Sequence, residues 1–369
     1  MDGKTAKPAK PEEVVDLVRA GTALMAKGGG TKPSLWEVAD STRVIDMTNL
    51  SGIVEYLPSE YTITVKSGIK LQTVVEALGK NGQYLPFDPP LAEQGASIGG
   101  TVAAGLSGPG AYRYGPLKDF IIGVRFVDGL GNHVRGGGNV VKNAAGFDFP
   151  KLFNGSLGRL GLLTEVSFKV FPEPQRYVSL QARLPSLEKG AGLLPRLKGF
   201  DLEGVELNSN LLLSLRLGYQ QPTMAARRRA LESLVGTPLS LTLGEEEGEI
   251  WRNFKRFSWQ GNHRYLFKVA THPASALRLI RSLDEQTWQF HLGNGGKALY
   301  LACPEAADIE SLNRLLQTQK LTGLQLKGPV SSHPLIGENP GIGFVCRLQK
   351  ALDPNGIFPS FSPADPLPA

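Results

Sequence analysis

Two runs of small residues in the first third of the chain have the composition of phosphate-binding loops. Residues 27–32 read Lys-Gly-Gly-Gly-Thr-Lys, and residues 94–104 read Gln-Gly-Ala-Ser-Ile-Gly-Gly-Thr-Val-Ala-Ala. A glycine has no side chain, so its backbone N–H group can approach an anion closely. Each run also lies beside an apolar segment typical of a strand or a helix. Together they predict two loops that close on one diphosphate, as in a nucleotide cofactor.

The common phosphate-binding motifs do not fit these runs. A P-loop ends in Gly-Lys-Ser/Thr, whereas residues 30–32 read Gly-Thr-Lys and Met25 stands where the first glycine belongs. The dinucleotide fingerprint G-x-G-x-x-G fails at the last glycine of residues 108–113. Any single glycine is equally well explained as a turn residue with positive φ. Three successive glycines beside a second cluster favour binding, by loops between strands and not by a Rossmann helix.

Composition and charge exclude several classes of protein. The net charge of +6 over 369 residues is modest, and the one dense basic cluster, residues 227–229, lies in an expected amphipathic helix, so nucleic-acid binding is not expected. The two cysteines, Cys303 and Cys346, have neither disulfide-framework nor iron–sulfur spacing. No apolar run reaches the roughly 18 residues of a membrane span, and the polar N-terminus does not resemble a signal peptide. We expect a cytoplasmic protein without direct membrane insertion, peripheral to a membrane only through a partner.

Hydrophobic periodicity divides the chain into two regions of different character. Prolines 172 and 174 mark the boundary. Before it, the pattern predicts helices from residue 11 and over 70–79, and strands at 22–26, 43–47, 52–57, 62–66, 120–128, 133–135 and 162–170. A helix beginning at Ser97 is expected to turn its first N–H groups toward the diphosphate. After the boundary, strands at 178–183, 211–218, 264–270 and 298–302 and helices at 186–194, 224–234, 274–284 and 309–317 predict an antiparallel sheet with helices on one face.

The five histidines do not form a metal site by spacing, because no H-E-x-x-H or H-x-H motif occurs. Each is interpreted as a surface or locally satisfied imidazole. They are His133, His263, His272, His291 and His333.

Four segments match, in order and spacing, the FAD-binding domain of the vanillyl-alcohol oxidase/p-cresol methylhydroxylase (PCMH) flavoproteins. They are residues 27–32, 95–104, 114–115 and 155–165. The run Lys-Asn-Ala-Ala-Gly-Phe-Asp at 142–148, with Lys151-Leu152, is similar to the glycolate oxidase branch. Length and a short C-terminal part most resemble the family of FAD-binding E subunits of glycolate oxidase (glycolate dehydrogenase). The resemblance is strong over residues ~10–175, moderate over ~340–360 and weak between.

The resemblance implies an α+β fold: a PCMH-type two-subdomain FAD-binding domain with a reduced α+β cap domain. The FAD-binding domain would be residues 1–174, with subdomains at about 1–90 and 91–174. The cap would be residues 175–330, and residues 331–369 would return to the FAD domain. The implied cofactor-binding residues are Lys27, Gly28, Gly29, Gly30, Thr31, Lys32, Pro89, Gly95, Ala96, Ser97, Ile98, Gly99, Gly100, Ala103, Ala104, Tyr114, Gly115, Gly158, Gly161 and Leu163.

The same resemblance implies noncovalent FAD. Thr31 occupies the position of the flavin-linked histidine in some relatives, and no cysteine precedes Cys303. Residues 291–296, His-Leu-Gly-Asn-Gly-Gly, lack the aspartate and second histidine of the substrate-binding metal segment in catalytic relatives, so we interpret them as a turn without metal. Residues 352–359 resemble the C-terminal segment that returns to the flavin domain, although relatives continue into Asn-Pro-Gly.

The expected function is electron transfer in the oxidation of glycolate, a 2-hydroxy acid, to glyoxylate. The implied partners are a catalytically complete flavoprotein subunit and an iron–sulfur subunit of a glycolate oxidase-type complex. No catalytic residue is identified from the sequence. Two alternatives stay open: a stand-alone FAD-dependent 2-hydroxyacid oxidoreductase, and a cofactor-free assembly subunit.

Overall fold

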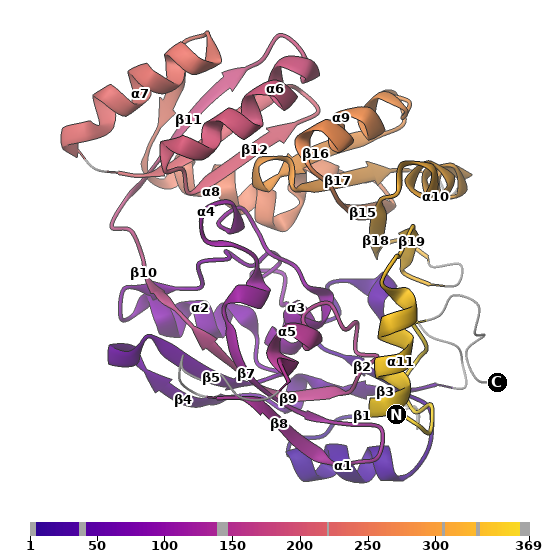
Figure 1. Ribbon diagram of the computed structural model, residues 1–369. Helices are drawn as coiled ribbons and strands as arrows, with labels where there is room; N and C mark the ends of the chain where they lie inside the picture. Colours follow the sequence, from indigo (N-terminus) through magenta and orange to yellow (C-terminus); the bar gives the residue numbers. More distant parts are fainter. Residues whose placement is uncertain are drawn as a thin grey trace.

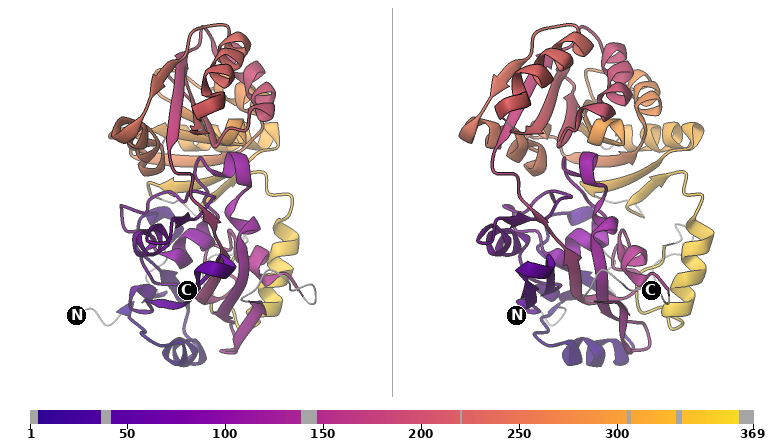
Figure 2. Two further views of the ribbon diagram at one scale, coloured as in Figure 1. Left: turned by 90° about the vertical axis from the view of Figure 1, so that its left-hand side faces the viewer. Right: turned by 60° about the vertical axis from the view of Figure 1, so that its left-hand side comes forward.

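The computed structural model describes residues 5–36, 42–138, 147–219, 221–304, 307–329 and 333–361 (Figure 1). Residues 142–146 of the glycolate oxidase-like segment lie outside this described part. The first half of the chain forms one body, and residues from about 177 to 337 form a second body above it in Figures 1 and 2. We call them the flavin domain and the cap.

A small parallel sheet begins the flavin domain. Its order is β1 (Thr5–Ala6), β3 (Arg43–Asp46) and β2 (Leu24–Lys27). Helix α1 (Pro11–Arg19) starts at a proline with Glu12 and Glu13 in its first turn, which complements the helix dipole. Its buried Val14 and Val18 pack in one cluster with residues of β2 and β3. This packing fixes β2, and the first glycine loop follows β2 directly.

The second sheet of the flavin domain has five antiparallel strands. Their order is β4 (Ile53–Leu57), β5 (Thr62–Lys66), β9 (Leu162–Lys169), β7 (Ile121–Val127) and β8 (His133–Gly137). On β5, Ile63 and Val65 face the apolar core, and Thr64 hydrogen-bonds Ser167 at 2.8 Å. Strands from before and after residue 90 therefore belong to one sheet, so a division near residue 90 does not separate two sheets.

Short helices and a two-stranded ribbon complete the flavin domain. Helix α2 buries Leu71, Val74 and Leu78, as the helical spacing predicts. Helix α3 carries the second glycine run. The remaining elements are bounded as follows: α2 (Leu71–Gly79), α3 (Ile98–Ala104), α4 (Ala111–Tyr114), α5 (Phe149–Phe153), β6 (Gln83–Tyr84) and β10 (Phe171–Pro172).

The cap is built on a nine-stranded antiparallel sheet. Its order is β14 (Ser240–Thr242), β11 (Tyr177–Arg183), β13 (Leu212–Gly218), β12 (Gly204–Asn208), β16 (Gln289–Gly293), β17 (Ala298–Cys303), β15 (Tyr265–Ala270), β18 (Thr322–Lys327) and β19 (Leu335–Gly337). Helices α6 (Leu187–Leu193), α7 (Gln221–Val235), α9 (Pro273–Arg281) and α10 (Ala307–Gln319) share one apolar cluster with the sheet.

Helix α8 (Gly244–Arg256) covers the other face of the cap sheet, so the expectation of helices on one face only is wrong. Along β11, Val178 and Leu180 join the cluster of the other four helices, whereas Ser179 points the opposite way. There its hydroxyl accepts from Trp251 Nε1 at 2.7 Å and donates to Glu247 at 3.0 Å, both on α8. The sequence pattern did not predict α8, because its first turn is rich in glutamate and contains no apolar residues at helical spacing.

The cap and the flavin domain are joined by charged contacts and by a shared core. Lys255 at the end of α8 pairs with Asp88 at 2.9 Å, and Arg113 pairs with Asp201 at 2.9 Å. Leu266 of the cap belongs to the apolar cluster of the flavin domain. The cap is therefore packed directly against the flavin domain.

The C-terminal part of the described chain lies along the flavin domain (Figure 1). It contains α11 (Ile342–Leu352). Leu24 N–H donates to the Ile357 carbonyl at 2.8 Å, and Ile357 and Phe358 pack with β2 and α1.

Among the described residues, no helix has both the length and the apolar character needed to cross a bilayer.

Candidate cofactor site

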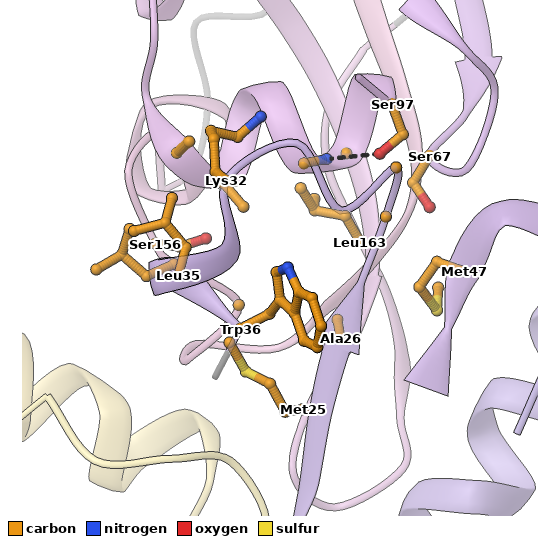
Figure 3. A pocket seen from close by; sticks show the side chains of 18 of the residues that line it. Met25, Ala26, Lys32, Leu35, Trp36, Met47, Ser67, Ser97, Ser156 and Leu163 are labelled. Carbon is orange, nitrogen blue, oxygen red and sulfur yellow. Dashed lines mark hydrogen bonds between the residues drawn. The ribbon is translucent and has the colours of Figure 1, made fainter. Parts of the chain in front are cut away.

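Three glycine-containing loops surround one cavity of the flavin domain (Figure 3). Residues 28–32 follow β2, residues 97–104 form the start and body of α3, and residues 156–161 precede β9. The cavity encloses about 720 Å³, including the part open to solvent.

Most of the residues named from the sequence line this cavity. They are Gly28, Gly29, Gly30, Thr31, Lys32, Ser97, Gly99, Gly100, Ala103, Ala104, Gly158, Gly161 and Leu163. The pairing of the first two glycine runs across one space is therefore present in the structure. Figure 3 shows Lys32, Ser97 and Leu163 around the same opening.

The first two loops touch each other through backbone atoms. A Cβ on Gly29 would lie 1.8 Å from the Gly95 carbonyl oxygen, and a Cβ on Gly28 would lie 2.0 Å from Ser97 Oγ. Neither position has room for a side chain. Glycine is thus required here for the close approach of two chain segments, beyond any need for an unusual turn.

The first loop presents backbone donors that have no internal acceptor. Within the described part of the chain, the N–H groups of Gly29, Gly30, Thr31 and Lys32 donate to no acceptor. Gly30 has φ +69°, which turns the chain sharply at this point. Successive free N–H groups in such a turn form a concave anion-binding surface.

The expectation that the first N–H groups of α3 face the diphosphate is wrong. Ile98 N–H donates to the Ile69 carbonyl at 3.0 Å, Gly99 N–H to the Ser67 carbonyl at 2.7 Å, and Gly100 N–H to Ser97 Oγ at 3.3 Å. The N-terminus of α3 is therefore already capped by other groups of the chain. The side of α3 faces the cavity, and its small residues there leave space for a ligand. They are Gly99, Gly100, Ala103 and Ala104.

Lys32 is a buried cation without an anionic partner. Its residue is 7% exposed, and its ammonium donates to Thr31 Oγ1 at 3.0 Å. No carboxylate of the described residues lies within ion-pair distance of it. Burial lowers the pKa of Lys32 to about 8. A charge removed from water without a counter-ion is costly, so an anion bound in the cavity would restore its full charge.

Three further polar atoms on the cavity wall are buried and have no hydrogen-bond partner among the described residues. They are Ser67 Oγ, Ser156 Oγ and Trp36 Nε1. An unpaired buried polar atom costs about 1–3 kcal/mol, and a polar ligand would satisfy such atoms. Free N–H groups, a lone ammonium and unpaired side-chain atoms around a glycine cradle together fit the diphosphate and polar groups of FAD.

Seven of the residues named from the sequence do not line the cavity. Gly95, Ala96 and Ile98 support the second loop from behind, and Lys27 packs outside the first loop. Tyr114 packs edge-on against Tyr84 and Phe171. Gly115 forms a turn beside Asp119, and Pro89 follows Asp88 at the cap contact.

Sequence reasoning missed eight lining residues, most of them apolar. Several flank the glycine runs directly, and that adjacency was an available signal. Ser67 and Met47 come from distant strand ends, and no local pattern marks them. The missed residues are Met25, Ala26, Leu35, Trp36, Met47, Ser67, Ser156 and Leu157.

His291 is not a surface imidazole. It is 2% exposed and its Nε2 forms a short hydrogen bond with the Glu206 carboxylate, while Trp259 stacks on its ring at 5.6 Å. Residues 289–293 are strand β16, and the turn that was expected follows at 294–296. These groups border a small cavity of about 290 Å³ between the cap and the flavin domain.

Burial and the Glu206 charge raise the pKa of Tyr300, which lines the same small cavity. No group of three or more histidine, cysteine, aspartate or glutamate side chains with the arrangement of a metal site occurs among the described residues. Among the described residues, His291 and Glu206 therefore have no third metal-ligating side chain beside them, and we interpret them as a hydrogen-bonded pair. The Asn294 N–H also donates to Glu206, at 3.0 Å.

Comparison with known proteins gives a consistent result. The family model described as FAD binding domain matches residues 4–137. Glycolate oxidase subunit GlcE of Escherichia coli (strain K12) is 31% identical over 308 residues, which cover 78% of this chain and 87% of that protein. Glycolate oxidase subunit GlcD of Bacillus subtilis (strain 168) is 30% identical over 163 residues, which cover 44% of this chain and 33% of that protein.

Among solved structures, an alkyldihydroxyacetonephosphate synthase has the same fold. The TM-score is 0.66 at 16% identity, over 96% of this chain and 75% of that one. A glycine-lined cavity on this fold defines a flavoprotein whose cofactor is FAD. The chain belongs to the PCMH-type FAD-binding family of oxidoreductases, and its resemblance to the E subunits of glycolate oxidase is confirmed. The expected α+β fold class is confirmed as well.

Replacing Gly29 by valine is expected to abolish FAD binding while the protein stays folded. The new side chain would collide with the Gly95 carbonyl and separate the two loops. The measurement is the FAD content after purification, with the circular dichroism spectrum as the check on folding. Gly79→Val is the matched control, because nothing lies within 4 Å of a Cβ at that position. Stoichiometric FAD in Gly29→Val would show that the loop contact is dispensable.

FAD affinity is expected to fall as the pH rises above about 8. The free protein loses the Lys32 proton near that pH, whereas a bound diphosphate keeps the ammonium charged, so binding above pH 8 requires proton uptake. The dissociation constant should be flat below pH 8 and rise by up to about tenfold per pH unit above it. Calorimetric titration from pH 6.5 to 9.5 measures this. Lys32→Arg should remove the pH dependence, and an unchanged profile in that variant would contradict the assignment.

Proposed function

We propose that this chain is the FAD-binding subunit of a glycolate oxidase-type complex. It would hold FAD noncovalently and transfer electrons during the oxidation of glycolate, a 2-hydroxy acid, to glyoxylate. The observation that carries the proposal is the cavity: a cradle of close-packed glycines, free N–H donors and the lone Lys32 ammonium. The similarity to glycolate oxidase subunit GlcE over most of both chains supports the choice of reaction.

The residues of the cavity divide the tasks of binding between them. The free N–H groups of residues 29–32 and the Lys32 ammonium would bind the diphosphate. The bare side of α3, at Gly99 to Ala104, would let the cofactor lie against the backbone. Met25, Leu157 and Leu163 provide apolar walls that exclude water. FAD, when bound, supplies the capacity to accept and donate electrons.

Noncovalent attachment is supported by the residues that surround the cavity. None of the described lining residues is a histidine or a cysteine, and Thr31 stands in the first loop. Cys303 is buried in the cap strand β17, and Cys346 lies on α11. The histidine-linked and cysteine-linked forms of covalent flavin therefore have no attachment residue among the described lining residues.

We also propose the domain limits 1–174, 175–330 and 331–369, with the last segment returning to the flavin domain. The hydrogen bond from Leu24 N–H to the Ile357 carbonyl supports that return. β19, which lies beyond residue 330, pairs with β18 of the cap, so the third segment also completes the cap sheet.

The proposed partners are a catalytic flavoprotein subunit and an iron–sulfur subunit. Partners are supported by the similarity to two glycolate oxidase subunits, GlcE and GlcD, and by the kinds of residue in the described cavity. Oxidation of a 2-hydroxy acid calls for cations that hold its carboxylate and for a base that takes its proton. Lys32 is the one cation that lines the cavity among the described residues, and the diphosphate would occupy it. His291 Nε2 is held by Glu206 inside the cap.

Acid precipitation of the purified protein is expected to release its flavin into the supernatant. Denaturation removes every noncovalent contact, so only a covalent bond would retain the cofactor. The measurement is the absorbance at the flavin band in supernatant and pellet. A yellow pellet with a clear supernatant would contradict noncovalent binding, and a colourless protein that takes up no FAD would favour the assembly subunit.

The isolated chain is expected to oxidise glycolate and D-lactate negligibly. Positioned cations and a general base each contribute orders of magnitude to such a rate, typically about 10²–10⁴-fold for the base alone. Anaerobic stopped-flow mixing of the flavin-loaded chain with glycolate measures the rate of flavin bleaching. Rapid bleaching without a partner would establish the stand-alone oxidoreductase instead.

A further inference from the structure

Trp36 lines the cofactor cavity, although no sequence motif assigns it a role. It follows a short turn at Pro33–Leu35, directly after the first glycine loop. Figure 3 shows its indole in the middle of the cavity, with the ring nitrogen on the side of Lys32 and Leu163. No other aromatic ring is among the described residues that line this cavity.

The backbone of Trp36 is held in place by its own turn and by the cap. Trp36 N–H donates to the Pro33 carbonyl at 3.2 Å, and Leu35 N–H donates to the Lys32 carbonyl at 3.1 Å. Ser34 Oγ donates to the Gly328 carbonyl, at the end of cap strand β18, at 2.6 Å. The indole thus projects into the cavity from a turn that is fixed on two sides.

One face of the indole is covered by Lys27. The Lys27 ammonium lies 4.2 Å from the ring centroid, a distance typical of cation–π contacts. Lys27 does not line the cavity, so it covers the ring from outside. Its side chain also packs over the loop, because a Cβ on Gly30 would lie 3.3 Å from Lys27 Cε.

The indole N–H is buried without an acceptor among the described residues. A buried tryptophan N–H normally finds a hydrogen-bond partner, because leaving it unpaired is costly. Leu163, on the side of the ring nitrogen in Figure 3, has no acceptor atom in its side chain. An acceptor would therefore have to come with the ligand.

We propose that Trp36 is a cofactor-contacting residue that recognises a planar ring of the dinucleotide. The face of its indole opposite Lys27 packs on that ring, and Nε1–H, which lies in the indole plane, donates to an oxygen of the adjoining sugar or diphosphate. The inference rests on the proposed function, that this cavity binds FAD. FAD carries two such rings, adenine and isoalloxazine, one on each side of the diphosphate that the first loop would hold. Trp36 is close enough to that loop to meet one of them.

Affinity measurements on three variants test the contact. In Trp36→Leu, which loses the ring, the dissociation constant for FAD is expected to rise about ten- to a hundredfold, as for the loss of one ring-on-base stack. In Trp36→Phe, which keeps a ring but loses the N–H group, the rise should be smaller, about three- to tenfold. Trp259→Phe is the matched control: its indole N–H is also buried and unpaired, but it lies in the cap against His291. That variant should bind FAD as the wild type does.

Titration of the same variants with ADP identifies the ring. ADP carries the diphosphate and the adenine but no isoalloxazine. A loss of ADP affinity in Trp36→Leu equal to the loss of FAD affinity assigns the contact to adenine. Unchanged ADP affinity together with weakened FAD affinity assigns it to isoalloxazine.

Indole ¹⁵N NMR of the flavin-free full chain supplies a readout that a purely structural role would not move. The chain has four tryptophans, at positions 36, 251, 259 and 288. The Trp36 signal is the one missing from Trp36→Phe, and FAD should shift it downfield as the N–H group gains an acceptor. The Trp251 signal should stay, because its N–H group already donates to Ser179.

Three results would overturn the inference while the proposed function stands. They are wild-type FAD affinity in Trp36→Leu, tighter binding in that variant, and a Trp36 signal that does not move at saturating FAD. Failure of the wild-type chain to bind FAD at all would overturn the proposed function and this inference together. The two failures are thus distinguished by the wild-type titration.

Discussion

The cofactor site depends on the contact between two backbones, at Gly29 and Gly95. These residues belong to loops more than sixty positions apart, and a single Cβ at Gly29 would come 1.8 Å from the carbonyl of Gly95. The contact sets the distance between β2 and α3, and so sets the width of the cavity between them. It also leaves the first loop without internal acceptors, since its turn faces the cavity and not the chain. The backbone contact between Gly29 and Gly95 therefore explains both the unbonded N–H groups of the first loop and the space for a ligand.

The charged side chains of the cap contact and the charged side chain of the cofactor cavity differ in their partners. Lys255, Arg113 and Arg256 each meet a carboxylate across the cap contact, so their charges are balanced within the chain. Lys32 is more deeply buried, at 7% exposure, and it meets no carboxylate among the described residues, so burial lowers its pKa. A buried charge beside an opposite charge of the same chain is compensated within the folded protein. A buried charge without such a partner is compensated only when an ion or ligand of opposite charge binds beside it. This difference marks Lys32 for binding.

The sequence was most informative where a local pattern carries the structure. Glycine runs marked the loops, and the alternation of apolar residues in β5, β9 and β15 marked strands close to their true bounds. It failed where a side chain is placed by contacts that are distant along the chain. Ser67 faces the cavity because β5 ends there, and His291 is buried because Glu206 reaches it from another strand. Helix α8 was missed because its acidic first turn conceals a helix whose apolar residues, such as Trp251, come late.

The shared core has a consequence for the cap that does not depend on any ligand. Leu266, Tyr300 and Leu326 of the cap sheet are part of the same apolar cluster as Phe87 and Phe120 of the flavin domain. Removing the cap would expose these side chains to water, at a cost of about 25 cal/mol for each Å² of apolar surface. A lineage in which the cap no longer handled substrate would still be under selection to retain it. The cap sheet can therefore persist as a structural lid whose sequence drifts everywhere except on the face turned toward the flavin domain.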